Sequence, residues 1–206
     1  MTITSAQLAL YSGALIILFL TPGPVWIAII ARTVSGGKRS ALSLAMGVSL
    51  GDMLWPVIVF FGLGLLISVY ADILILFRFI AALILSIMGL QIVLTAKKSL
   101  SANEKLTKSG FFAGFLAGFI AVTANPKAAL FYLTLLPGFF DFKKIGSLDL
   151  FIISITSFSI PMLGNLLIIL CLSKVKSFIS TPNVIRIINV VSGILLIMVG
   201  VIIVLT

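Results

Sequence analysis

The 206-residue chain has no histidine and a single cysteine, Cys171. Without histidine, the chain lacks the most common metal ligand and the usual base that activates a nucleophilic serine. A lone cysteine excludes an intramolecular disulfide and a CxxC thiol relay. No motif supports a Ser–Lys arrangement. We therefore expect no bound metal, no cofactor and no enzymatic activity.

Charge is also scarce, because charged residues make up 9% of the chain and hydrophobic residues 61%. Soluble domains carry about 25% charged residues. A chain this apolar cannot cover its own surface with polar groups, so a lipid bilayer must act as its solvent. The formal net charge is +9, but the basic residues stand in short segments between apolar runs. They indicate membrane topology, and we expect no nucleic-acid partner.

The apolar runs predict an all-α integral membrane protein, since a straight span needs about 20 residues. The predicted six spans are at roughly 6–34, 40–67, 73–96, 110–138, 147–172 and 184–205. The first and fourth are longer than a straight span needs and contain proline breaks, at Thr21-Pro22-Gly23-Pro24 and Asn125-Pro126. The N-terminus has no basic segment or small-residue cleavage site, so the first run is expected to be a retained helix.

Basic residues are distributed unevenly between the segments that join these spans. Ten lie in the segments after the first, third and fifth spans: Arg32, Lys38, Arg39, Lys97, Lys98, Lys105, Lys108, Lys174, Lys176 and Arg186. Lys143 and Lys144 lie in the segment after the fourth span. The positive-inside rule places the more basic side in the cytoplasm. It predicts a multi-pass protein of the cytoplasmic (inner) membrane with both termini outside.

The two halves of the chain resemble each other. Residues 82–95 and 193–206 align without gaps and share six identical positions. Each segment is the third span of its half, and each half has a proline break in its first span. A repeat of three spans must be inverted in the membrane, and inverted repeats with broken helices are typical of transporters. We predict one transmembrane domain, 1–206, of two repeats, about 1–100 and about 105–206.

The proline breaks are candidate binding elements. The prolines of the first break free the carbonyls of Leu18 and Leu20, and Pro126 frees that of Val122. Freed carbonyls suit an ammonium group, and the N-terminus of the half-helix after each break suits a carboxylate. Gly23 adds backbone freedom. A zwitterionic amino acid presents both charges. The alternative is that the breaks only shape helix packing.

Three polar side chains inside the predicted spans are further candidates. Asp52 is a costly carboxylate in an apolar helix, and Pro56 frees its carbonyl. It could bind an amine, carry a coupling proton or serve as a structural partner for a basic residue. Lys127 could pair with Asp52, meet a substrate carboxylate or extend to the membrane interface. Asn165, near Pro161, holds roughly the place in the second half that Asp52 holds in the first, and could line a cavity or bond a neighbouring helix.

Glycine and tryptophan patterns permit less definite expectations. Three GxxxG pairs, Gly47/Gly51, Gly110/Gly114 and Gly114/Gly118, predict close helix packing. The packing could lie within the monomer or in a homodimer, so a dimer stays possible. Trp26 and Trp55 could close over a substrate, or fill space.

Four motifs in order resemble those of the LysE/RhtB family of amino-acid exporters: Thr21-Pro22-Gly23-Pro24, Gly47-x3-Gly51-Asp52, Asn125-Pro126-Lys127-Ala128-Ala129-Leu130-Phe131 and Leu136-Pro137-Gly138-Phe139. The resemblance implies a six-helix fold and export of amino acids or close derivatives from the cytoplasm, driven by the membrane potential or proton gradient. It would make central residues of Pro22, Gly23, Pro24, Asp52, Asn125, Pro126 and Lys127. Trp26 departs from the polar residues common in the family and favours a smaller pocket or apolar substrates.

The expected partners are therefore an amino-acid-like small molecule and membrane lipid. Two alternatives stay open at this point. The same fold could export another small solute or a cation, although one clear carboxylate within the spans and no histidine argue against a metal ion. The second alternative is that the chain is a membrane subunit with no transport role, but this role does not explain two helix breaks at matching positions.

Overall fold

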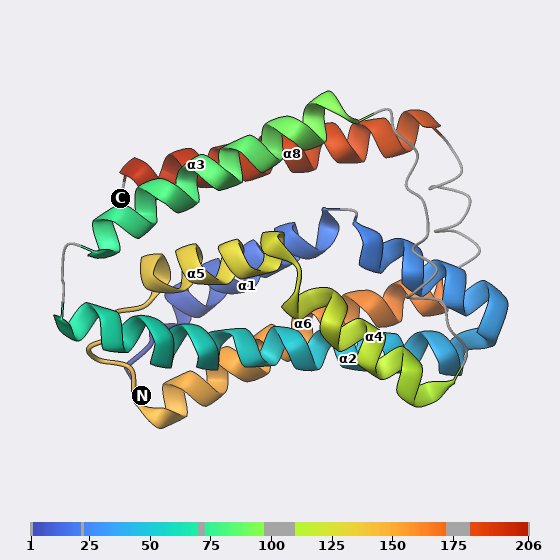
Figure 1. Cartoon of the computed structure of the whole chain (residues 1–206), viewed down its shortest axis with the longest axis horizontal. Coiled ribbons are helices and arrows are strands. Elements are labelled where there is room, and N and C mark those ends of the chain that lie inside the picture. The colour runs from blue at the N-terminus through green and yellow to red at the C-terminus, as the bar shows by residue number, and fades with distance from the viewer. Residues whose placement is uncertain (1, 22, 70–72, 97–109, 172–181, 206) are drawn as a thin grey trace.

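A computed structural model describes residues 2–21, 23–69, 73–96, 110–171 and 182–205 of the chain (Figure 1). Regular secondary structure in these residues is helical throughout. Pro22 lies outside the described residues. The helices are α1 (Ser5–Leu20), α2 (Pro24–Val69), α3 (Ile73–Leu94), α4 (Phe111–Thr123), α5 (Pro126–Phe139), α6 (Ser147–Leu170) and α8 (Pro182–Leu205).

Two helical segments within the described residues are each long and apolar enough to cross a membrane, Gly36–Gly62 and Ser147–Leu170. Two further spans result if each bent helix pair counts as one. These pairs are Ser5–Leu20 with Val25–Val34, bent by 62°, and Phe111–Thr123 with Pro126–Phe139, bent by 55°. The expected helical membrane class and the two broken helices are thus confirmed.

Helix α2 reverses direction at Gly37, which has φ 72° and ψ 176°. This is a conformation that residues with a Cβ rarely adopt, so glycine is required here. Figure 1 shows the helix doubling back, so that a first arm (24–36) and a second arm (38–69) run in opposite directions. The reversal falls in the gap predicted between the first and second spans.

Arg32, at the end of the first arm, is fully buried, although the charge pattern predicted a loop residue. Its guanidinium donates hydrogen bonds across the reversal to the Ser40 carbonyl (3.2 Å) and the Ser40 hydroxyl (3.0 Å). The sequence could not show this burial, because it depends on the second arm and on Gly114 of α4, which abuts the guanidinium.

The second arm of α2 packs on α4 through glycines of both helices. A Cβ at Gly47 would collide with the Phe115 backbone, and one at Gly118 with the Leu44 backbone. Small residues thus bring the two helix backbones together, as GxxxG pairs do in membranes. Of the two alternatives for the GxxxG pairs, packing within the monomer is therefore confirmed for Gly47 and Gly118. Gly110 plays a different part, because it precedes α4 with φ 105° and its Cβ would meet nothing closer than 3.9 Å.

Helices α3 and α8 form an antiparallel pair, drawn side by side at the top of Figure 1. A Cβ at Gly89 would lie 2.5 Å from the Gly193 carbonyl oxygen, and one at Gly193 would lie 2.6 Å from that of Gly89. Nearby, the Asn189 side-chain amide donates to the carbonyl of Ala96 (3.3 Å). These contacts fix the register of the last helix on the third.

The outer surface of the bundle carries large apolar side chains. Leu94 and Phe112 are each 74% exposed. The bundle interior, in contrast, contains buried polar groups such as Asp52, Asn165 and Ser157. Apolar side chains outside and polar side chains within are the distribution expected where lipid replaces water as the solvent.

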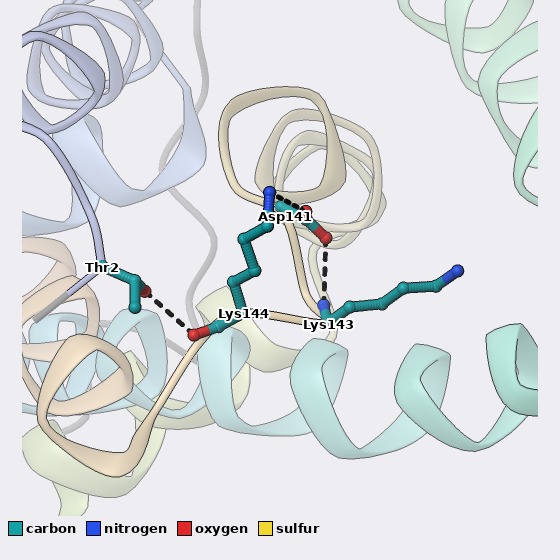
Figure 2. A network of polar contacts seen from close by, with 4 residues as sticks. All are labelled: Thr2, Asp141, Lys143 and Lys144. Carbon is teal, nitrogen blue, oxygen red and sulfur yellow. Dashed lines mark hydrogen bonds and ion pairs between the residues drawn. The ribbon is translucent and has the colours of Figure 1, made fainter.

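The connection between α5 and α6 lies near the N-terminus (Figure 1), and Figure 2 shows a contact between the two, from Thr2 to Lys144. The Thr2 hydroxyl oxygen lies 2.9 Å from the Lys144 carbonyl and 2.8 Å from the buried carboxylate of Asp149, and the two acceptors share its one hydrogen. Lys144 and Asp141 form an exposed ion pair at 3.2 Å. Hydrogen bonding from Lys144 lowers the pKa of Asp141. Of the two lysines in this connection, Lys143 and Lys144, the charge of Lys144 is therefore neutralised by Asp141.

Candidate functional site

Both helix breaks meet at one cavity of about 300 Å³ inside the bundle. This volume is at the lower end of the range of ligand pockets, about 300–1,000 Å³, and suits a small molecule. Its lining residues are Leu15, Leu18, Phe19, Thr21, Gly23, Val25, Trp26, Val48, Asp52, Ile92, Val122, Asn125, Lys127, Ala128, Pro161 and Asn165. Five residues predicted from the sequence are thus brought together: Gly23, Asp52, Asn125, Lys127 and Asn165.

Lys127 connects the second break to the first. Its ammonium donates to the carbonyls of Leu18 (3.4 Å) and Thr21 (3.3 Å) at the end of α1. The Leu18 carbonyl is one that the sequence predicted to be freed by proline. Within the described residues, the one ion pair shorter than 4.0 Å is that of Lys144 with Asp141, so Lys127 is not paired with Asp52. The lysine charge is held by backbone dipoles instead.

The second break presents the N-terminus of α5 to the cavity. Asn125 is the N-cap residue, and its side-chain oxygen accepts the Lys127 N–H (3.0 Å). Pro126 is the first helical residue, where its missing N–H costs nothing. The next N–H is that of Ala128, a cavity residue, and it has no acceptor among the described residues. A helix N-terminus with a spare N–H attracts negative charge.

Asp52 lies on the second arm of α2 and is 4% exposed. The Tyr132 hydroxyl donates to its Oδ1 atom (3.1 Å), and no donor among the described residues bonds Oδ2. Trp55 stacks on Tyr132, with ring centroids 6.1 Å apart. Tyr132 is the partner of Asp52 that sequence reasoning missed. It is one of three tyrosines in the chain, and a tyrosine within an apolar span is itself a usable signal, because a buried hydroxyl needs a partner.

Asn165 faces the same cavity from α6, which is the first of the two alternatives that the sequence left open for it. It is 1% exposed, and its side-chain oxygen has no hydrogen-bond partner among the described residues. Leaving a buried acceptor unpaired costs free energy, about 1–3 kcal/mol. A group that is left unsatisfied at a cavity wall is suited to accept a hydrogen bond from a ligand.

Two buried hydroxyl groups, those of Tyr11 and Ser157, lie next to each other in the interior of the bundle. The hydroxyl oxygens of Tyr11 and Ser157 are 2.6 Å apart, and the Ser157 hydroxyl also donates to the Ile153 carbonyl (2.8 Å). Both side chains are fully buried. This pair joins α1 to α6 in the interior of the bundle.

Trp26 bridges the first break. Its indole N–H donates to the Phe19 carbonyl (2.9 Å), across the point where α1 ends and α2 begins. The two rings also touch, with centroids 5.4 Å apart. Trp26 lines the cavity, whereas the indole nitrogen of Trp55 is buried without a partner in the described structure.

The glycine and prolines of the breaks have distinct positions. Pro24 and Pro126 each begin the helix after a break. Gly23 does not have a positive φ, and a Cβ there would meet nothing within 4 Å. Gly23 therefore leaves open space at the break, whereas the sequence suggested a need for backbone freedom.

The order of these features along the chain agrees with a known family. A family model described as LysE type translocator matches residues 16–206. The chain belongs to this family. This match confirms the family resemblance seen in the sequence. LysE type translocators are multi-pass membrane transporters rather than enzymes, so the expectation of no enzymatic role is also confirmed.

Curated proteins similar to this LysE type translocator include transporters with named cargo. The chain is 32% identical to the uncharacterized membrane protein slr1627 of Synechocystis, over 92% of this chain and 91% of the relative. It is 32% identical to the threonine efflux protein of Escherichia coli K12, over 57% of this chain and 58% of that protein. It is 28% identical to the leucine efflux protein of Salmonella typhimurium, over 64% and 62% respectively. No solved structure matches the chain.

Proposed function

We propose that this LysE type translocator exports amino acids or close derivatives from the cytoplasm, as a secondary transporter driven by the proton gradient or membrane potential. The observation that carries the proposal is the single cavity where both helix breaks, Asp52 and Asn165 converge. Two of the similar proteins are efflux proteins for threonine and leucine, which supports the same cargo class.

The cavity offers acceptors for a substrate ammonium group. Asp52 has an oxygen free of donors in the described chain, and Asn165 has an unpaired side-chain oxygen. Hydrogen bonds between charged partners are stronger than neutral ones. An ammonium bound between these two side chains would satisfy both acceptors.

The substrate carboxylate has a separate partner at the N-terminus of α5. The Ala128 N–H points from the positive end of that helix and lacks an acceptor in the described chain. The Lys127 ammonium lies one residue away along the chain and adds positive charge. The acceptors, Asp52 and Asn165, are thus separate from the donors at the N-terminus of α5. A zwitterion can use both sets, whereas a simple cation can use only the acceptors.

The proposal includes six spans arranged as two inverted repeats, with alternating access around the cavity. Both chain ends lie at the same end of the molecule in Figure 1, which agrees with an even number of spans.

The proposed orientation keeps both termini outside the cytoplasm, on the evidence of the ten basic residues on the other side. A homodimer has less support, because four of the glycines that suggested one are used within the chain. These are Gly47, Gly51, Gly114 and Gly118.

The test is efflux from cells loaded with a mixture of labelled amino acids. Wild type is expected to release one or a few of them faster than empty cells, and Asp52→Asn to slow that release by about tenfold or more, because it removes a charge from the ammonium site. Asp141→Asn is the matched control, since it neutralises an exposed carboxylate that does not line the cavity. Equal release from wild-type and empty cells for every amino acid would refute the proposal.

A further inference from the structure

The wall of the cavity contains an aromatic ring that contacts two neighbouring residues, Trp26 and Gly164. Phe19, in the last turn of α1, lines the cavity. On one side its ring lies against Trp26, which also bonds the Phe19 carbonyl. On the other side the ring tip rests directly on Gly164 of α6. A Cβ at Gly164 would lie 2.5 Å from Cζ, 2.6 Å from Cε1 and 2.7 Å from Cε2 of the ring.

The rest of the wall has little to offer a polar substrate side chain. Beyond the groups assigned above to the substrate ammonium and carboxylate, the lining is mostly apolar, with Leu15, Val48 and Val122 among its members. Two polar side chains remain. The Thr21 hydroxyl donates its hydrogen to the Ile17 carbonyl (2.9 Å), and the side-chain oxygen of Asn125 accepts the Lys127 N–H (3.0 Å). A buried substrate hydroxyl or charge would therefore lose its water partners without full replacement, at a cost in free energy.

We propose that the export site selects amino acids with aliphatic side chains of about the size of leucine, and that the Phe19 ring, seated on Gly164 and held by Trp26, sets the upper limit of side-chain size. This inference rests on the proposed export function. It names the substrate class and assigns Phe19 and Gly164 to specificity. Neither residue was singled out by the sequence.

Gly164→Ala tests the size limit directly. The added methyl meets the far end of a side chain, so the ring moves while the helices keep their places. With Trp26 on its other side, the displaced ring narrows the cavity. One methylene in an apolar pocket changes discrimination by about 10–200-fold. We expect the ratio of leucine efflux to alanine efflux to fall by about tenfold.

Gly13→Ala is the matched control, because it makes the same exchange within α1 where a Cβ meets nothing within 4 Å. Its leucine-to-alanine ratio is expected to equal that of wild type. Phe19→Ala acts in the opposite direction and should admit phenylalanine. Gly164→Ala combined with Phe19→Ala should restore leucine efflux, because the methyl then has no ring to displace. Membrane expression of each variant is matched before efflux is compared.

The outcomes separate this inference from the proposed function. Efflux of aliphatic amino acids with a ratio changed by Gly164→Ala, and restored in the double variant, supports the inference. Efflux of threonine or lysine in preference to leucine overturns the substrate class but leaves amino-acid export intact. Efflux of leucine with an unchanged ratio in Gly164→Ala overturns the size limit alone. No efflux of any amino acid by wild type overturns both proposals.

Discussion

The two helix breaks differ in how their unpaired backbone groups are satisfied. At the first break, carbonyl oxygens at the end of α1 accept hydrogen bonds from Lys127, which belongs to the other break. At the second break, Asn125 caps the α5 N-terminus with its own side chain. Besides the local bond from Trp26 to the Phe19 carbonyl, the first break therefore uses a donor from a distant part of the chain, whereas the second is capped by its own residue. Substitutions at each should have correspondingly different effects.

The largest effect is expected from Lys127→Met, which removes the ammonium that bonds the carbonyls of Leu18 and Thr21 at the first break. Hydrogen bonds from charged groups contribute about 1.5–3 kcal/mol. We expect a lower unfolding temperature in detergent and efflux reduced about tenfold or more. Lys127→Arg keeps the positive charge, and it should retain part of the thermal stability and part of the efflux rate of wild type. Unchanged thermal stability of Lys127→Met would show that the first break does not need this contact.

A smaller effect is expected at the second break from Asn125→Ala. Loss of an N-cap side chain costs about 1 kcal/mol. Asn125→Asp keeps an acceptor for the Lys127 N–H and should behave like wild type in thermal unfolding. If Asn125→Ala destabilises the protein as much as Lys127→Met, the second break is not locally satisfied and the contrast between the breaks fails.

The smallest effect is expected from Gly23→Ala at the first break. A methyl there meets nothing within 4 Å, and the backbone has no positive φ that would be strained. Stability should stay within about 0.5 kcal/mol of wild type, or rise slightly through the unfolded state. Gly37→Ala is the informative comparison, because φ 72° at Gly37 demands glycine. Equal thermal stability of the two variants would contradict the assignment of separate roles.

The helical class and both breaks could be predicted because their causes are local. Apolar runs of span length and prolines within them determine these features whatever surrounds them. Asp52 and Asn165 could be predicted as cavity residues for a related reason, since a polar side chain inside an apolar span needs a polar environment. The structure places both at the cavity.

The partners of these groups could not be predicted, because they come from distant segments. Lys127 reaches the carbonyl of Leu18, and Tyr132 reaches the carboxylate of Asp52. The sequence offered Asp52 itself as a partner for Lys127, since opposite charges attract. Freed carbonyls compete for the same ammonium, and only the fold determines which acceptor is near.

The close reversal of α2 has a consequence for how the chain enters the membrane. The segments on either side of Gly37 are joined with hardly any spacer. Arg32, before the reversal, donates hydrogen bonds to the carbonyl and the hydroxyl of Ser40, three residues after Gly37. A guanidinium that would be costly to insert alone is thus accompanied by its acceptors as soon as the next few residues are synthesised. The first two apolar segments are therefore suited to leave the insertion machinery together, as a hairpin.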